Sequence, residues 1–229
     1  MTRRWTDASI SAQMTVDGQP RGTESTPGTR IRPASAADLV ALGGIRTAGE
    51  QGGLLPVLGA SAWRNVLREY LRDPGSILLV AASPDDEIHG YSLATARSVI
   101  VQRRAIARSP TLWMAAAKGA LRQPGAIAPI IRRAAHVIRP ARSDSVRPEP
   151  SLRLLDIVVA SEARGRGLGR ALLEETLDAA AAMGYREIGL SVLADNAAGI
   201  GLYERSGFLP SGQGIRPDGR AYLTMRRPI

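Results

Sequence analysis

The sequence of 229 residues contains no cysteine, two histidines and one lysine. Without cysteine the chain cannot form a disulfide, bind iron–sulfur clusters or zinc through thiolates, or use a cysteine nucleophile. His89 and His136 are too few for a three-histidine metal site, so we expect no metal. The lysine, Lys118, stands in Ala-Lys-Gly and does not fit the Gly-x-x-x-x-Gly-Lys-Ser/Thr pattern of nucleotide hydrolases. These absences favour chemistry that needs neither a metal nor a thiol.

Long apolar runs are also missing. No stretch approaches the roughly 18 uninterrupted apolar residues that a membrane span requires. The segment Thr2-Arg-Arg-Trp5 lacks the apolar core of a secretory signal, so we expect a cytoplasmic protein. Residues 1–28 contain few aliphatic side chains and are expected to form a flexible tail. The remainder, residues 29–229, has the length of one domain.

Acidic residues are absent from Ile88 to Ser143, where basic side chains contribute +10, although the whole chain carries +9. Apolar residues within Leu112–Leu121 and Ile127–Ile138 predict two amphipathic helices. We interpret residues 99–148 as a basic helical insertion. Three roles stay open: a lid that binds an acidic substrate, a surface for an anionic membrane or a partner, or a solvated arginine face.

A strand-to-helix turn carries the strongest chemical signal. The apolar run from Leu152 to Val159 predicts a buried strand, and apolar residues between Leu172 and Ala180 recur at helical spacing. The glycines of Arg164-Gly-Arg-Gly-Leu-Gly169 would let a phosphate approach the backbone, toward which the first N–H groups of the helix point. Arginine side chains would add charge-assisted donors. We therefore expect an anion-binding turn.

The spacing of the glycines argues against a dinucleotide-binding fold. That fold reads Gly-x-Gly-x-x-Gly after a strand, whereas the third glycine here, Gly169, comes one position early. An acidic residue that binds ribose should end the next apolar run, but Glu187 precedes it. The phosphate ligand is therefore expected to belong to another class.

Two motifs resemble the GNAT superfamily of acetyl-CoA-dependent N-acetyltransferases. The family motif Arg/Gln-x-x-Gly-x-Gly/Ala is matched by Arg164-Gly-Arg-Gly-Leu-Gly169. A second motif, Asn-x-x-Ala-x-x-Leu-Tyr-x-x-x-Gly-Phe, is matched from Asn196 to Phe208, with Gly199 at the alanine position. We expect this glycine to loosen helix packing slightly.

The resemblance implies an α/β fold with a mixed, mostly antiparallel central sheet flanked by helices, interrupted by the insertion. A first strand and helix would start at Thr29, with Ser35 or Asp38 as the cap. Residues 76–82 and 87–94 would form a hairpin. The closing hairpin would pair residues 208–215 with 221–226.

The resemblance also implies acetyl-CoA as co-substrate. Its pantetheine arm would lie between the strands 152–159 and 187–193, and its pyrophosphate would bind the turn. The residues expected to bind the cofactor are Ile157, Val158, Val159, Arg164, Gly165, Arg166, Gly167, Leu168, Gly169, Arg170 and Asn196. Asn196 could equally cap the following helix.

The resemblance makes Tyr203 the general acid that protonates the departing thiolate. The general base is less defined, because Ser191 stands where the family often has glutamate. Asp156 on the preceding strand is our first candidate, although it could merely pair with an arginine. Glu69 and Tyr70 could enter the acceptor pocket from the second helix.

We expect direct transfer of acetyl to a primary amine of a small molecule, amino-sugar-like or anionic. The alternative acceptor is the amino terminus of a peptide or protein. A third hypothesis is a basic protein that binds membranes or nucleic acid on this scaffold. Nucleic acid is not expected, since Trp113 is the single aromatic residue of the insertion; membrane contact is the weaker alternative. The chain would act as a monomer or homodimer.

Overall fold

A computed structural model describes residues 28–49, 54–108, 151–216 and 219–229. Seven strands of this part form one sheet in the order β1-β2-β3-β4-β5-β7-β6. Their bounds are β1 Arg30–Pro33, β2 Ser76–Ala82, β3 Ile88–Thr95, β4 Ser151–Val159, β5 Glu187–Leu193, β6 Leu209–Ile215 and β7 Ala221–Pro228. All neighbours are antiparallel except β4 and β5. The expected mixed, mostly antiparallel sheet is confirmed.

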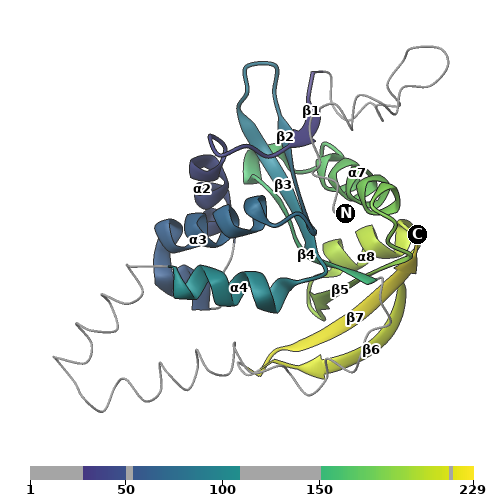
Figure 1. Cartoon of the computed structure of the whole chain (residues 1–229). Helices are drawn as coiled ribbons and strands as arrows, with labels where there is room; N and C mark the ends of the chain where they lie inside the picture. The colour runs from purple at the N-terminus through teal and green to yellow at the C-terminus, as the bar shows by residue number, and fades with distance from the viewer. Residues whose placement is uncertain (1–27, 50–53, 109–150, 217–218) are drawn as a thin grey trace.

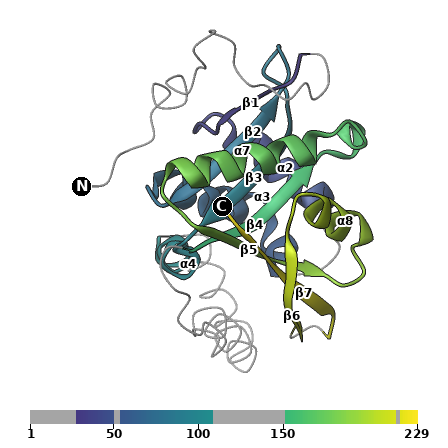
Figure 2. The same cartoon turned by 90° about the vertical axis from the view of Figure 1, so that its right-hand side faces the viewer.

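Helices cover both faces of the sheet (Figure 1). The helices are α2 Leu39–Gly49, α3 Leu54–Arg72, α4 Ser98–Ala107, α7 Leu168–Ala182 and α8 Ala197–Arg205. Helices α2, α3 and α4 lie on one face, and α7 and α8 lie on the other (Figure 2). A short 3-10 helix, η2 (Ser161–Ala163), follows β4.

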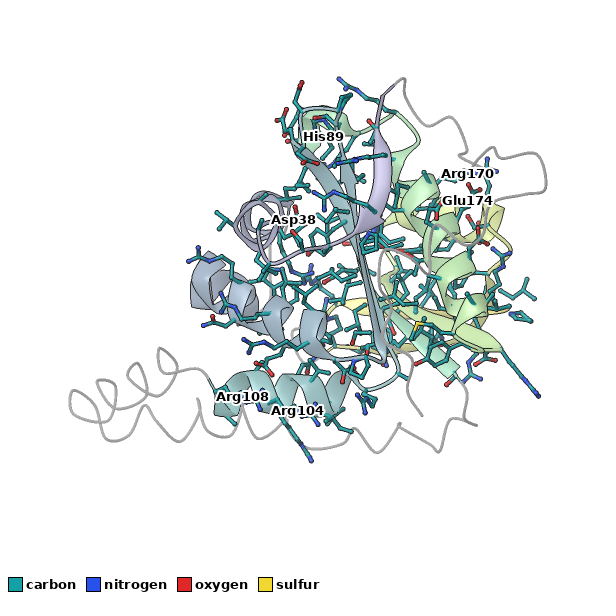
Figure 3. All side chains as sticks on the ribbon, turned by 45° about the horizontal axis from the view of Figure 1, so that its top comes forward. Asp38, His89, Arg104, Arg108, Arg170 and Glu174 are labelled. Carbon is teal, nitrogen blue, oxygen red and sulfur yellow. The ribbon has the colours of Figure 1, made fainter. Side chains whose placement is uncertain are left out.

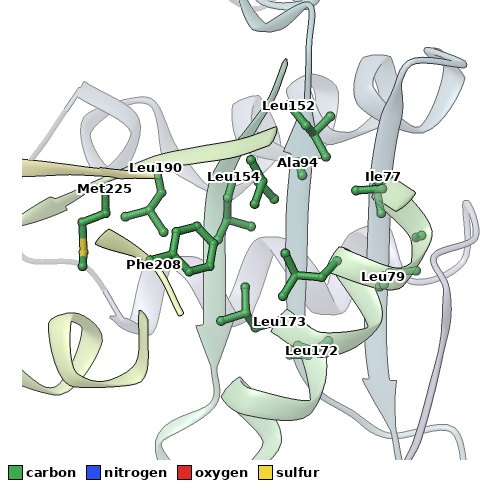
Figure 4. Close-up of a cluster of buried hydrophobic side chains, with 14 of the residues drawn as sticks. Ile77, Leu79, Ala94, Leu152, Leu154, Leu172, Leu173, Leu190, Phe208 and Met225 are labelled. Atoms are coloured by element: carbon green, nitrogen blue, oxygen red, sulfur yellow. The ribbon is translucent and has the colours of Figure 1, made fainter. Parts of the chain in front are cut away.

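Each face of the sheet has its own apolar core. On the α7 face, Leu172 and Leu173 pack with side chains of the strands such as Leu79, Leu154 and Leu190 (Figure 4). The α3 face buries a second cluster, whose larger members are Trp63, Leu67, Tyr70, Val80, Tyr91 and Leu93. The sheet is therefore buried from both sides around β4, the strand that leads into the anion-binding turn.

Both predicted hairpins are present. Between β2 and β3, Ser83 N–H donates to the Glu87 carbonyl at 2.9 Å, and Asp86 takes a positive φ of 62°. Strand β3 begins at Ile88, one residue later than expected. Strand β7 runs two residues beyond the expected end and pairs with both β5 and β6.

Ser35 and Asp38 act together at the start of α2. The Asp38 carboxylate accepts from the Ser35 N–H at 2.6 Å and from the Ser35 hydroxyl at 2.9 Å. Arg32 on β1 donates to both of its oxygens, at 2.8 and 2.9 Å. Burial alone would raise the pKa of Asp38, but these hydrogen bonds outweigh burial and lower it. The Arg32–Asp38 ion pair therefore holds β1 to the start of α2.

The described part of the basic insertion is α4, a helix that the sequence analysis did not predict. Val101 and Ala105, four residues apart, are buried and hold it to the domain. The two helices expected within 112–121 and 127–138, and the expected tail, lie outside the described residues. In the described part of the chain, no helix is long and apolar enough to cross a membrane.

Candidate active site

The turn between β4 and α7 forms an open cradle. Gly165 and Gly167 have positive φ angles of 77° and 78°, and Gly167 occupies the N-cap position of α7. A Cβ at either position would meet no heavy atom within 4 Å, so the space beside the backbone is free. Because the first N–H groups of a helix have no intrahelical acceptor, they are available to an anion here.

The three arginines of the turn are held differently. Arg164 Nε donates back to the Val159 carbonyl at 3.2 Å, which anchors the turn to the end of β4. Arg170 Nε bonds Glu174 one helical turn along α7 at 2.7 Å (Figure 3). Arg166 is exposed between the two glycines. Arginine charge thus surrounds the cradle.

A gap opens between β4 and β5 beside this turn. The two strands pair only from Ser151 and Glu187 to Arg153 and Gly189. A bulge at Leu155 interrupts the pairing of β4 with β3, which resumes at Asp156 and continues through Ile157, Val158 and Val159. The second edge of these three residues faces no strand partner among the described residues. The separation that the family resemblance implied is therefore present.

Asn196 caps the helix that carries Tyr203. Its side-chain oxygen accepts from the Gly199 N–H at 2.9 Å, the alternative considered for this residue. A Cβ at Gly199 would lie 2.7 Å from the Asn196 amide nitrogen. The glycine in the family's alanine position therefore makes room for the cap, a consequence more specific than the expected loosening of the helix.

Tyr203 lies on α8, partly buried against the α7-face core. Its ring meets Phe208 edge to face, with centroids 5.7 Å apart. Burial, and secondly the carboxylate of Asp156, raise the pKa of Tyr203 to about 12. The phenol is therefore protonated throughout the physiological pH range.

Asp156 forms an ion pair with Arg46 of α2 on the other face of the sheet. Both side chains are largely buried, with 14% and 12% of their surface exposed, and the Arg46 guanidinium lies 4.4 Å from the centre of the Trp63 ring. Burial works against the charge of Arg46, but Asp156 outweighs it and raises the pKa of Arg46. The arginine that pairs with Asp156 comes from α2, not from the basic insertion.

Sequence reasoning missed Arg46 and Trp63. The available signal was weak: Arg46 is the one charged residue of α2, whose sequence is otherwise apolar or small. Tyr91 of β3 is fully buried beside the pair, and burial and Asp156 raise its pKa while Arg46 opposes the rise. Aromatic side chains and one guanidinium thus enclose the Asp156 carboxylate.

Glu69 and Tyr70 are directed toward α4. Glu69 is buried and binds Arg108 at 2.8 Å and Arg72 at 3.2 Å. The buried Tyr70 hydroxyl accepts from Gln102 of α4 at 3.3 Å. These contacts hold both candidates in the packing between α3 and α4.

Two buried acids at the C-terminal end of α3 pair with arginines in and around α4. Arg108 binds Glu69, and Asp73, the residue that follows α3, is paired with Arg97 and lies 3.9 Å from Arg104 (Figure 3). These arginines therefore dock α4 onto α3. Among the residues that the structure describes, no three His, Asp or Glu side chains are grouped to hold a metal ion.

Known proteins resemble this chain in sequence. It matches the acetyltransferase (GNAT) family over residues 55–208. A mycothiol acetyltransferase from Beutenbergia cavernae is 50% identical over 48 residues, which are 21% of this chain and 16% of that enzyme. A ribosomal protein bS18-alanine N-acetyltransferase from Escherichia coli K12 is 46% identical over 55 residues, 24% of this chain and 37% of that enzyme. The matched segments cover much less than two thirds of either relative.

Solved structures share the fold. A ribosomal-protein-alanine N-acetyltransferase from Brucella melitensis superimposes with a TM-score of 0.58 at 23% identity, over 87% of this chain and 99% of that chain. The sequence match to the family extends over more than half of the present chain and contains both the cradle and the Tyr203 helix. The chain belongs to the acetyltransferase (GNAT) family.

Proposed function

We propose that this chain transfers an acetyl group from acetyl-CoA directly to the primary amine of a small molecule. One observation carries the proposal: β4 and β5 separate after Arg153, beside an open glycine cradle. Tyr203 and Asp156 approach this region from opposite faces, close enough for the carboxylate to raise the pKa of the phenol. This arrangement supports the proposal, because it would bring bound acetyl-CoA, a proton acceptor (Asp156) and a proton donor (Tyr203) close together.

The cradle and the gap fit acetyl-CoA. The open space at Gly165 and Gly167, the helix N–H groups and the exposed Arg166 would hold its pyrophosphate. The free edge of Ile157, Val158 and Val159 would bind the pantetheine amides through backbone hydrogen bonds. The bound thioester supplies the acetyl group.

The side chains of the site would handle two protons. Asp156, which is paired with Arg46, would take a proton from the acceptor ammonium directly or through water. The neutral Tyr203 phenol gives a proton to the departing sulfur. Asn196 holds the first turn of α8 and thereby places Tyr203.

A peptide amino terminus is the second candidate acceptor. It is favoured by the sequence match to an enzyme named for the alanine of ribosomal protein bS18. That match spans 24% of this chain, so it does not decide between peptides and small amines.

A panel of amines with acetyl-CoA tests the proposal. Free CoA thiol should appear only with certain amines, and mass spectrometry should find one acetyl group on the amine consumed. A panel of amino sugars, polyamines and peptides with free amino termini would separate the two acceptor classes. If no amine causes thiol release, although CoA binds, the proposed activity is wrong.

A further inference from the structure

Arg153 stands where the gap between β4 and β5 begins. Its Cα partner Gly189 is the last residue of β5 that pairs with β4, and Arg153 Nη2 donates to the Ser191 hydroxyl at 3.0 Å. Leu152 and Leu154 on either side of Arg153 are buried in the α7-face core. Because side chains alternate along a strand, Arg153 lies on the opposite face.

Ser191 lies on this same face. Its neighbours Leu190 and Val192 are buried on the α7 face, and Ser191 itself is exposed. The bulge at Leu155 shifts the alternation along β4, so that Asp156 also points away from α7 and reaches Arg46. Arg153, Ser191 and Asp156 thus lie on one face of the sheet, the face opposite α7 and α8, beside the place where β4 and β5 separate.

Arg153 has no acidic partner in the described part of the chain. The two neighbouring carboxylates on this face have their own arginines: Asp156 pairs with Arg46, and Glu187 lies 3.9 Å from Arg226. Within the described residues, Arg153 bonds only the neutral hydroxyl of Ser191. A guanidinium stays charged at any physiological pH, so no described acid compensates this positive charge where β4 and β5 separate.

We propose that Arg153, oriented by Ser191, binds an anionic group of the acceptor, so that the preferred amine also carries a carboxylate or a phosphate. The planar guanidinium offers paired N–H donors that match either group. This inference rests on the proposed acetyl transfer and specifies its acceptor. It places the choice of acceptor on β4, while Arg97 and Arg108 at the two ends of α4 are paired with Asp73 and Glu69.

Matched pairs of acceptors test the inference. One pair is an amino sugar and its 6-phosphate, and the other is a peptide with Glu or Gln at its second position. In at least one pair, the wild type should have a higher kcat/KM for the anionic member than for the neutral member. Whether this is the phosphate pair or the carboxylate pair tells which anion Arg153 binds. Arg153→Gln should lower kcat/KM for this anionic amine about tenfold and change the neutral one by less than about twofold.

Further variants separate binding from folding. Arg153→Lys should retain part of the preference for the anionic amine, because the positive charge remains while the paired N–H donors of the guanidinium are lost. Ser191→Ala should weaken the same preference, because Arg153 loses the hydroxyl that orients it. Arg68→Gln on α3, an exposed arginine bonded to Asn65, is the matched control and should keep the preference. Equal rates for both members, or a preference that survives Arg153→Gln, would overturn the inference but leave acetyl transfer intact. If no amine is acetylated, the proposed function fails and this inference with it.

Discussion

Tyr203 derives its expected role from two neighbours in the fold. Phe208 packs against its ring, and Asp156 acts on its hydroxyl from across the sheet. With its pKa raised to about 12, the phenol keeps the proton that a general acid must deliver. A shift in this direction keeps the phenol neutral and argues against its acting as a general base.

Tyr203→Phe removes the proton donor while keeping the ring contact with Phe208. We expect kcat to fall by roughly 10²–10⁴-fold, the usual contribution of a positioned acid, with unchanged affinity for CoA. Steady-state kinetics and calorimetric CoA binding check both. Tyr185→Phe, whose hydroxyl bonds the Gly75 carbonyl at 3.5 Å, is the control and should keep its rate. An unchanged rate in Tyr203→Phe would remove this residue from the mechanism.

Arg46→Gln leaves the Asp156 carboxylate largely buried without its cation. Its protonation then becomes easier, so the acid limb of the pH–rate profile should move to higher pH. The free energy of unfolding should fall by about 3 kcal/mol, because breaking a buried pair strands one charge. Denaturant titration measures the second effect.

The variant Asp156→Asn tests whether a shift in the acid limb of the pH–rate profile of Arg46→Gln reports on the general base. If Asp156 is the base, this variant should lose most of the activity at every pH. Should it remain active while Arg46→Gln is merely less stable, the pair would be structural and the base would lie elsewhere.

At the scale of elements, the turn from β4 to α7 depends on glycines of positive φ. Gly167→Ala should strain the N-cap of α7 by about 1–2 kcal/mol and place a methyl group in the cradle. Gly184→Ala, at a φ of 82° beyond the other end of α7 and with equally open space, should cause the same strain. Both variants should lose similar stability in denaturant titration, but only Gly167→Ala should bind CoA more weakly. Equal CoA affinity in the two would exclude the cradle as the pyrophosphate site.

Local pattern predicted most elements, and contacts distant in sequence decided the rest. The hairpin around Asp86, the turn at Gly167 and the cap at Ser35 follow from neighbouring residues, so the sequence was enough. The bulge at Leu155 could not be predicted, because apolar residues stand on both sides of it in β4. The pairing of Arg46 with Asp156 joins residues 110 positions apart, and only the fold brings them together.

For the whole molecule, the contact of β1 with α2 makes stability depend on pH. Asp38 is buried, and its pKa is lowered on folding by Arg32 and Ser35. Its contribution is therefore fully present above the unfolded value, near pH 4, and is lost as the pH falls through the lower folded value. The Arg32–Asp38 pair also links the edge strand β1 to the start of α2.

Asp38→Asn should lower the free energy of unfolding by about 2 kcal/mol at pH 7, because hydrogen bonds to a charged group are lost. The difference from wild type should shrink below about pH 4, where the wild-type carboxylate also becomes protonated. Urea titrations from pH 7 to pH 3 measure it. Asp86→Asn, which removes exposed pairs with Arg30 and Arg32, is the control and should lower the stability much less than Asp38→Asn does. A difference that stays constant with pH would contradict the assignment.

The basic charge of the sequence is partly neutralised by acids from another part of the fold. The segment Ile88–Ser143 carries +10, yet Arg97 and Arg108 in its described part are paired with Asp73 and Glu69. Composition predicted a basic surface, but it could not show that buried acids at the end of α3 would neutralise part of that charge. The cradle between β4 and α7 could be predicted from local motifs, whereas the contacts around Asp156 could not.

Direct transfer to an amine is the central claim, and a single-turnover experiment tests it most directly. The enzyme, in excess, is mixed with acetyl-CoA labelled in the acetyl group, first alone and then with the amine panel. We predict no CoA thiol and no label covalently attached to the protein before the amine is added, and afterwards one labelled acetyl group on the amine for each thiol released. Label retained on the protein, or thiol released without any amine, would contradict the account.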